Sequence, residues 1–189
     1  MQSIKSLLDT PIRGKTILKA AAVCFLGLAV FVCAVEAFIF FSMRPPRENG
    51  IIADFQLHSS AYERLKSMLL EDDQVSEIST AGIETPSSLL KRSPSEVHFP
   101  ISRYNEYVTL LNKIGRGSVF RMKEKESNLV CVVAWGAGWA GDTRHMWVCW
   151  ADRPPSNEVG SLDSYYRNPR RQHNAFRRID GHWYLRADW

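Results

Sequence analysis

The longest hydrophobic stretch of the chain lies near its N-terminus. From residue 20 to residue 41 there are 22 consecutive positions with one charged residue, Glu36, and no proline. A helix of this length measures about 33 Å at about 1.5 Å per residue. The hydrocarbon core of a bilayer is about 30 Å thick, and about 20 helical residues cross it. The pattern therefore predicts a transmembrane helix over 20–41, in contact with the lipid bilayer.

The charges around this stretch predict its orientation. Four Lys or Arg residues and one Asp precede it, whereas two Arg residues follow it before the next acid. Because positive flanks favour the cytoplasmic side, we expect a bacterial inner-membrane protein with a cytoplasmic N-terminus. The predicted organisation is a cytoplasmic stub over 1–19, the transmembrane helix, a proline-containing linker over 42–50 and an extracytoplasmic domain over 51–189.

Other interpretations use the same residues. Val35-Glu36-Ala37 resembles a signal-peptide cleavage site, but the apolar stretch continues to Phe41, which favours an uncleaved signal anchor. A lipoprotein signal is not favoured, because Cys24 and Cys33 each follow Val where such a signal needs a small residue. A pilin is not favoured either, because its helix carries a Glu near the start, whereas Glu36 lies near the end of this stretch. Glu36 itself has two explanations, contact with a partner helix inside the membrane or a position near the interface.

Two amphipathic helices are predicted after the linker. Apolar residues recur every three or four positions over 60–72 and again over 102–114. Ser60 and Glu63 match a capping box at the start of the first helix. Ser102 is the expected cap of the second helix, and a glycine directly after it favours its end there.

From residue 118 onwards the apolar pattern changes to a period of two. Five segments rich in Val, Trp, Tyr and Phe predict strands over 118–123, 129–135, 145–151, 174–179 and 182–187. Short connections make neighbouring strands antiparallel. Residues 75–79 fit a further short strand, and 80–100 fit a loop with one helical turn over 87–91. The predicted fold class is α+β: the membrane helix is followed by two helices, and these two pack on a mostly antiparallel meander sheet of about 4–5 strands.

The last two strands predict a tight hairpin. Asp180-Gly181 is a dipeptide that two-residue hairpin turns favour. A turn at this position pairs Arg177 with Tyr184 and Arg178 with Trp183, so both arginines would lie over aromatic rings.

A glycine-rich segment separates two of the predicted strands. Residues 136–141 match the pattern G-x-G-x-x-G, but no helix follows them to hold a pyrophosphate, so we interpret them as a flexible hairpin loop and expect no cofactor. Cys131 and Cys149 flank this loop nearly opposite each other. Outside the cytoplasm they would form a cross-strand disulfide, and the alternative is two buried free thiols.

Trp139 and a group of arginines are the candidate interaction surface. The group has aromatic residues interleaved and consists of Arg167, Arg170, Arg171, Arg177 and Arg178. It favours an anionic or protein partner rather than nucleic acid, which is scarce outside the cytoplasm. The alternative is a solvated loop. It is favoured by the small net charge of residues 42–189, which carry 20 Lys and Arg against 18 Asp and Glu.

Composition and motifs limit the possible chemistry. The chain of 189 residues is 45% hydrophobic and 23% charged, which excludes disordered, collagen-like and disulfide-dense classes. The five histidines show no metal-ligand spacing, and no nucleophile elbow appears, so we expect no metal site and no catalytic residues. His145 with Asp142 and a serine is the one acid–base set to consider.

The C-terminal part carries a resemblance. Asp152-Arg-Pro-Pro, Ser161-Leu-Asp and Arg178-Ile-Asp-Gly-His-Trp-Tyr-Leu185 together resemble the end of small uncharacterised bacterial proteins that finish in a Trp-Tyr hairpin. The resemblance covers about a fifth of the chain and implies no activity. A hairpin of this kind is also similar to the end of cone-shaped α+β domains of the NTF2-like type.

These observations favour one function class and leave a second. The first is a single-pass membrane-anchored protein whose extracytoplasmic domain is a non-catalytic binding module. The alternative is a small anchored hydrolytic enzyme with a pocket between sheet and helices. A deep pocket with His145 or His182 beside a carboxylate would favour the enzyme.

Overall fold

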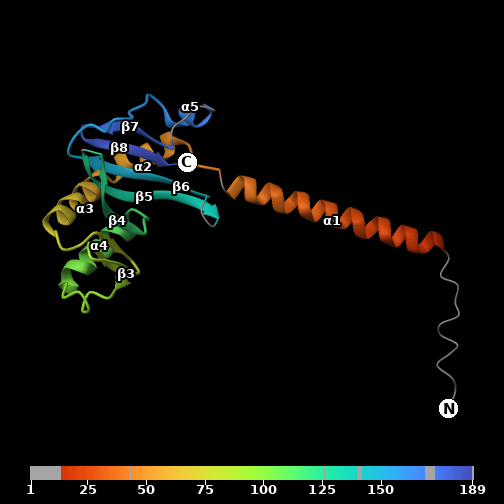
Figure 1. Ribbon diagram of the computed structural model, residues 1–189, viewed down its shortest axis with the longest axis horizontal. Helices are drawn as coiled ribbons and strands as arrows, with labels where there is room; N and C mark the ends of the chain where they lie inside the picture. The colour runs from red at the N-terminus through yellow and green to blue at the C-terminus, as the bar shows by residue number, and fades with distance from the viewer. Residues whose placement is uncertain (1–13, 43, 126, 140–141, 169–172, 189) are drawn as a thin grey trace, which may run out of the picture. The chain divides into compact units, whose positions relative to one another are not determined.

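The described part of the N-terminal unit of the protein contains a single long helix. The computed structural model describes residues 14–42, 44–125, 127–139, 142–168 and 173–188. It divides the chain into two units, Met1–Arg44 and Pro45–Trp189. The first unit contains α1 (Gly14–Ser42), a helix of 29 residues (Figure 1). No proline interrupts it, so each backbone N–H beyond the first turn finds its carbonyl four residues earlier.

The structure contradicts the prediction of a transmembrane helix over 20–41. Among the described residues, none of the helices has the length and apolar character needed to cross a membrane. The fold class is therefore corrected to α+β in which none of the described helices has the character of a transmembrane or signal-anchor helix.

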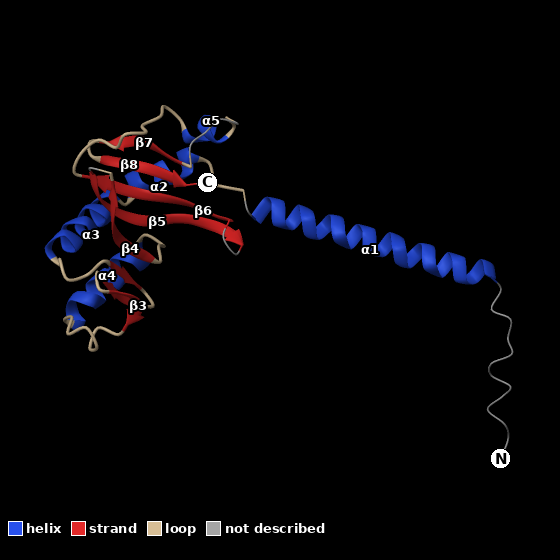
Figure 2. Ribbon diagram, in the orientation of Figure 1, coloured by secondary structure: helices blue, strands red, loops and turns tan. Residues whose placement is uncertain are grey.

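The second unit combines an antiparallel sheet with four helices in the described part of the chain. Eight strands lie in the order β3-β2-β1-β4-β5-β6-β8-β7. The strands are β1 (Glu77–Ser79), β2 (Gly82–Thr85), β3 (Ser88–Arg92), β4 (Ser118–Glu124), β5 (Ser127–Trp139), β6 (Asp142–Ala151), β7 (Asn174–Asp180) and β8 (Trp183–Asp188). The helices are α2 (Glu48–Leu57), α3 (Ser59–Glu71), α4 (Ile101–Lys113) and the short α5 (Leu162–Tyr166) (Figure 2).

The core lies between α2, α3, α4 and one face of the sheet. Tyr62, Leu65 and Leu69 of α3 are fully buried there, with Tyr107 of α4 and Val148 of β6. Alternate residues of the same strands point to the other face, as the pleat requires. They form a second, smaller cluster of Leu129, Cys131, Trp147, Cys149, Ala151, Phe176 and Tyr184. The sheet is therefore apolar on both faces, with the helices on one.

Two predicted helices are confirmed, although their caps are not. The helices predicted over 60–72 and 102–114 are α3 and α4. Neither has a side-chain cap: the N-cap positions are His58 and Pro100. Glu63, expected in a capping box, instead accepts a hydrogen bond from the Trp183 indole at 2.5 Å. Burial of the amphipathic stripe thus fixes these helices without the local cap.

Other predictions for this unit are wrong. The linker over 42–50 ends early because α2 starts at Glu48. The loop predicted over 80–100 contains β2 and β3, so the sheet has eight strands rather than about 4–5. Gly82 explains why so polar a segment can pair: its φ is +142°, and a Cβ there would lie 2.7 Å from the Arg92 carbonyl oxygen. A glycine permits this close approach of β2 to β3.

The predicted hairpin register is also wrong. Arg178, not Arg177, pairs with Tyr184, and Asp180 pairs with Trp183. The register shifts between Arg178 and Asp180, which moves the turn by one residue. Arg178 still lies over the Tyr184 ring, 5.5 Å from its centroid.

A disulfide joins the two central strands. Cys131 of β5 and Cys149 of β6 lie directly opposite each other, with their Cα atoms 4.1 Å apart, and form a disulfide across a sequence separation of 18. Both residues are fully buried. The segment over 136–139 between them is paired strand rather than flexible loop, because Gly136 pairs with His145 and Gly138 with Thr143. Residues 140–141 lie outside the described residues.

Replacing both cysteines by alanine should destabilise the second unit. Closing a loop of this length reduces the entropy of the unfolded chain, a contribution of about 3 kcal/mol. We expect Cys131→Ala/Cys149→Ala to lower the free energy of unfolding by that amount in a urea titration. Cys24→Ala/Cys33→Ala is the matched control, because both residues are free cysteines in α1. Equal stability of the two double variants would contradict the prediction.

Candidate functional site

The predicted interaction surface lies only partly within the described residues. Arg167 is an exposed residue directly after α5. Arg170, Arg171 and the side chain of Trp139 lie outside the described residues, although the Trp139 backbone ends β5 opposite Asp142.

Arg177 forms an ion pair with Glu48. Its guanidinium lies 2.6 Å from a carboxylate oxygen of Glu48, whose side chain is only 6% exposed. The same carboxylate accepts hydrogen bonds from the Ser161 hydroxyl at 2.7 Å and from the Leu162 backbone N–H at 2.6 Å. Glu48 therefore connects the start of α2 to the start of α5 and to β7.

These contacts shift the titration of Glu48. Burial acts to raise the pKa of its carboxyl group, but the hydrogen bonds from Ser161, Arg177 and the Leu162 N–H together lower it below the usual value. A carboxylate with a lowered pKa stabilises the folded state above its unfolded pKa of about 4.3. This stabilisation is lost as the pH falls through the pKa of the folded state.

The Glu48→Gln variant should be destabilised at neutral pH. We expect a loss of about 2 kcal/mol in the free energy of unfolding at pH 7, because buried donors lose their charged acceptor. The difference from the unchanged protein should shrink below about pH 4.3. Urea titrations across pH test this, with Glu158→Gln as the control, since the pair of Glu158 with Arg178 is exposed. A difference that persists unchanged in acid would contradict the assignment.

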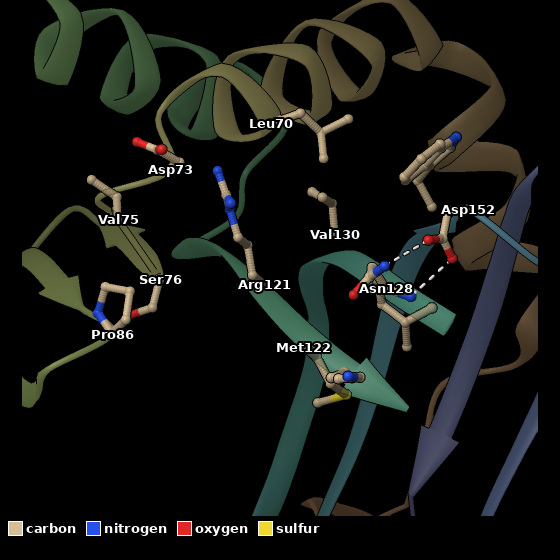
Figure 3. Close-up of a pocket in the computed structure, with 13 residues that line it drawn as sticks. Leu70, Asp73, Val75, Ser76, Pro86, Arg121, Met122, Asn128, Val130 and Asp152 are labelled. Carbon is tan, nitrogen blue, oxygen red and sulfur yellow. Dashed lines mark hydrogen bonds between the residues drawn. The ribbon is translucent and has the colours of Figure 1, made fainter. Parts of the chain in front are cut away.

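A pocket of about 510 Å³ lies on the helix-covered face, where the sheet continues beyond the end of α3. Its walls are mostly apolar and include Leu70, Val75, Val130 and Trp150. In Figure 3, Leu70 of α3 and Val130 of β5 point into the same space, while Met122 points to the opposite side of β4. The pocket thus forms where helical cover stops but the strands do not.

Arg121 of β4 provides a cation in this pocket. One of its Nη atoms donates to the Leu69 carbonyl oxygen in the last turn of α3. Its Nε atom is buried and has no hydrogen-bond acceptor among the described residues. The described carboxylates form no ion pair with it within 4.0 Å. Because the Arg121 guanidinium lines the pocket without an ion pair to a described carboxylate, it is suited to bind a carboxylate.

Five other polar residues line the pocket: Asp73, Ser76, Lys123, Asn128 and Asp152. Asp152 accepts hydrogen bonds from the Asn128 backbone N–H at 2.9 Å and from its amide at 2.6 Å. These hydrogen bonds lower the pKa of Asp152, so this side chain is an ionised clamp between β5 and β6. Asp73 and Lys123 are exposed residues of the pocket wall. In Figure 3 the Asp73 side chain lies near the end of the Arg121 side chain.

The histidines considered for catalysis lie elsewhere. His145 stacks on Trp147 with ring centroids 5.1 Å apart, and the Nδ1 atom of His182 lies 3.0 Å from the Ala151 carbonyl oxygen. Neither lines the pocket. The part of the chain that the structure describes contains no cluster of three or more His, Cys, Asp or Glu residues that could hold a metal ion.

The pocket residues had little signal in the sequence. Arg121 stands in a strand pattern of alternating residues, which does not tell which face of the sheet carries its side chain. That face is identified by Val119 and Val130, which pack in the core on the helix-covered side. Comparison with known protein families, with characterised proteins and with solved structures finds no match. The resemblance of the C-terminal part to small bacterial proteins therefore stays a prediction.

Proposed function

We propose that this protein is a non-catalytic binding module whose pocket takes an apolar ligand that carries a carboxylate. The observation that supports this most is Arg121, which lines the pocket and forms no ion pair with a described carboxylate within 4.0 Å. A ligand carboxylate would pair with this guanidinium group in a charge-assisted hydrogen bond.

The pocket walls support an apolar body for the ligand. Val75 and Val130 are almost fully buried, and Leu70 and Trp150 add larger apolar surfaces beside them. The volume of about 510 Å³ is within the usual range for small-molecule sites, about 300–1,000 Å³. An apolar wall with few polar groups is also the usual composition of such sites.

The disulfide supports a location outside the cytoplasm. Stable structural disulfides form in oxidising compartments, and cytosolic reductants keep thiols free. Cys131 and Cys149 pair inside the core, so we propose that the second unit works in such a compartment.

A hydrolytic enzyme has less support. The pocket lining has two carboxylates, but Asp152 already accepts two hydrogen bonds from Asn128, and no histidine stands beside either acid in the lining. A general base paired with a nucleophile, which hydrolysis by a side chain requires, is not among these pocket residues.

Binding of decanoate and decanol tests the proposal. Decanoate has an apolar chain and a carboxylate, and decanol has the same chain without the charge. We expect isothermal titration calorimetry to show decanoate binding at least tenfold more tightly than decanol. Arg121→Met should remove this preference, because about 1.5–3 kcal/mol is typical of a hydrogen bond to a charged group.

Arg167→Met is the matched control for this experiment. It removes the same charge from an exposed position outside the pocket lining and should leave decanoate affinity unchanged. Thermal unfolding of each variant checks that the loss of the Leu69 contact has not unfolded the domain. Equal decanoate affinity of Arg121→Met and the unchanged protein, or a larger loss in Arg167→Met, would overturn the proposal.

Asp73→Asn should strengthen decanoate binding. Asp73 lines the same pocket, so its charge repels a ligand carboxylate and competes for Arg121. We expect about two- to fivefold tighter binding at low ionic strength and a smaller gain at about 0.5 M salt. Glu106→Gln, on α4 and outside the pocket lining, is the control of equal charge change. Weaker decanoate binding by Asp73→Asn would show that this carboxylate helps to hold the ligand.

A further inference from the structure

The outer edge of β4 is only partly paired. β1 pairs with β4 at Phe120, Val119 and Ser118, and the Arg121 backbone N–H donates to the Ser76 carbonyl oxygen at 2.8 Å. Beyond this hydrogen bond, β4 continues to Glu124 with β5 as its only partner strand in the described part of the chain. The half of β4 that follows Arg121 is thus a free strand edge.

The backbone groups of Lys123 point to that edge. In an antiparallel ladder, the N–H and C=O groups of alternate residues point to the same side. Because Arg121 donates toward β1, Lys123 presents its N–H and C=O in the same direction. β1 does not extend alongside Lys123. Before β1, the Ser76 backbone N–H donates to the Glu84 carbonyl oxygen, and the Val75 backbone N–H donates to the Asp72 carbonyl oxygen.

This free edge borders the pocket. Arg121, Met122 and Lys123 are three consecutive residues of its lining, so backbone as well as side chains bound it. Ser76 and Pro86 line the opposite side (Figure 3). A free pair of backbone groups beside an apolar pocket with a cation is the arrangement that binds an extended peptide by strand addition.

We propose that the ligand of this pocket is an extended peptide segment that adds to β4 as an antiparallel strand and places a glutamate opposite Lys123. This inference rests on the proposed function, because it uses the same pocket and Arg121. The peptide glutamate exchanges two backbone hydrogen bonds with Lys123, and its side chain enters the pocket. Its apolar stem contacts the walls, and its carboxylate accepts from the Arg121 guanidinium.

The pleat specifies the neighbours of this glutamate. Arg121 and Lys123 lie on the helix-covered face, while Met122 and Glu124 lie on the other face. In an antiparallel strand, the residue after the glutamate pairs with Met122 and the residue before it with Glu124. An apolar residue fits beside Met122, and a small polar residue fits beside Glu124. The expected sequence is therefore small polar, Glu, apolar.

The peptide acetyl-Ser-Thr-Glu-Val-Ser-amide is a probe for this site. We expect it to bind the full chain in calorimetry and to compete with decanoate. N-methylation of the peptide glutamate removes the N–H that would donate to Lys123 and should weaken binding at least tenfold. Methylation of the threonine amide, which points away from β4, is the control and should have little effect. Replacement of the glutamate by glutamine should also weaken binding at least tenfold.

Lys123→Pro distinguishes this inference from the proposed function. Proline is tolerated where the missing N–H faces away from the ladder, so pairing with β5 is kept. We expect Lys123→Pro to lose peptide binding relative to Lys123→Ala, which lacks the same side chain but keeps the backbone N–H, while the two variants bind decanoate equally. Decanoate binding without peptide binding, or indifference to N-methylation, would overturn strand addition alone. Failure of decanoate and peptide together would overturn the proposed function as well.

Discussion

The pocket exists because α3 ends at Glu71 while β4, β5 and β6 continue beneath it. Over most of its length α3 buries Leu65 and Leu69 against the sheet, which gives both elements a dry contact surface. Where the helix stops, Val130 and Trp150 of the same strands line the pocket, and Lys66 of α3 lies over the Trp150 ring, 5.5 Å from its centroid. The end of α3 also exposes a carbonyl group without an intrahelical partner, and Arg121 donates to it. One structural feature thus supplies an apolar surface and positions a cation.

The remaining elements keep this end of the sheet in place. The disulfide between Cys131 and Cys149 ties β5 to β6, and the hydrogen bonds from Asn128 to Asp152 tie the same strands beside the pocket. Glu48 holds α2 to α5 and β7 at the other end of the strand order. Strands that are fixed on both sides can keep a short edge of β4 free without loss of the sheet.

The sequence predicts most of the elements but not the site. The helices α3 and α4 follow from apolar residues at helical spacing, and the five strands from 118 onwards follow from alternation, because both patterns reflect burial of one face. β2 and β3 escape prediction since their segment is rich in Ser, Pro and Thr, and a close approach at Gly82 permits pairing that composition does not suggest. The hairpin register fails through a shift at Arg178, which no local propensity encodes. Arg121 becomes a candidate only when α3 and β4 are placed together, because its significance depends on a buried Nε and a helix end that lies 52 residues away in the chain.

The most direct test of the account is the NMR signal of the Arg121 Nε–H group during a titration with decanoate. The account predicts that this resonance, assigned through its loss in Arg121→Met, moves downfield and exchanges more slowly with water as the carboxylate binds, because the donor gains a charged acceptor. An Arg121 Nε–H signal that stays unchanged while decanoate saturates the protein would contradict the claim that this arginine recognises the ligand.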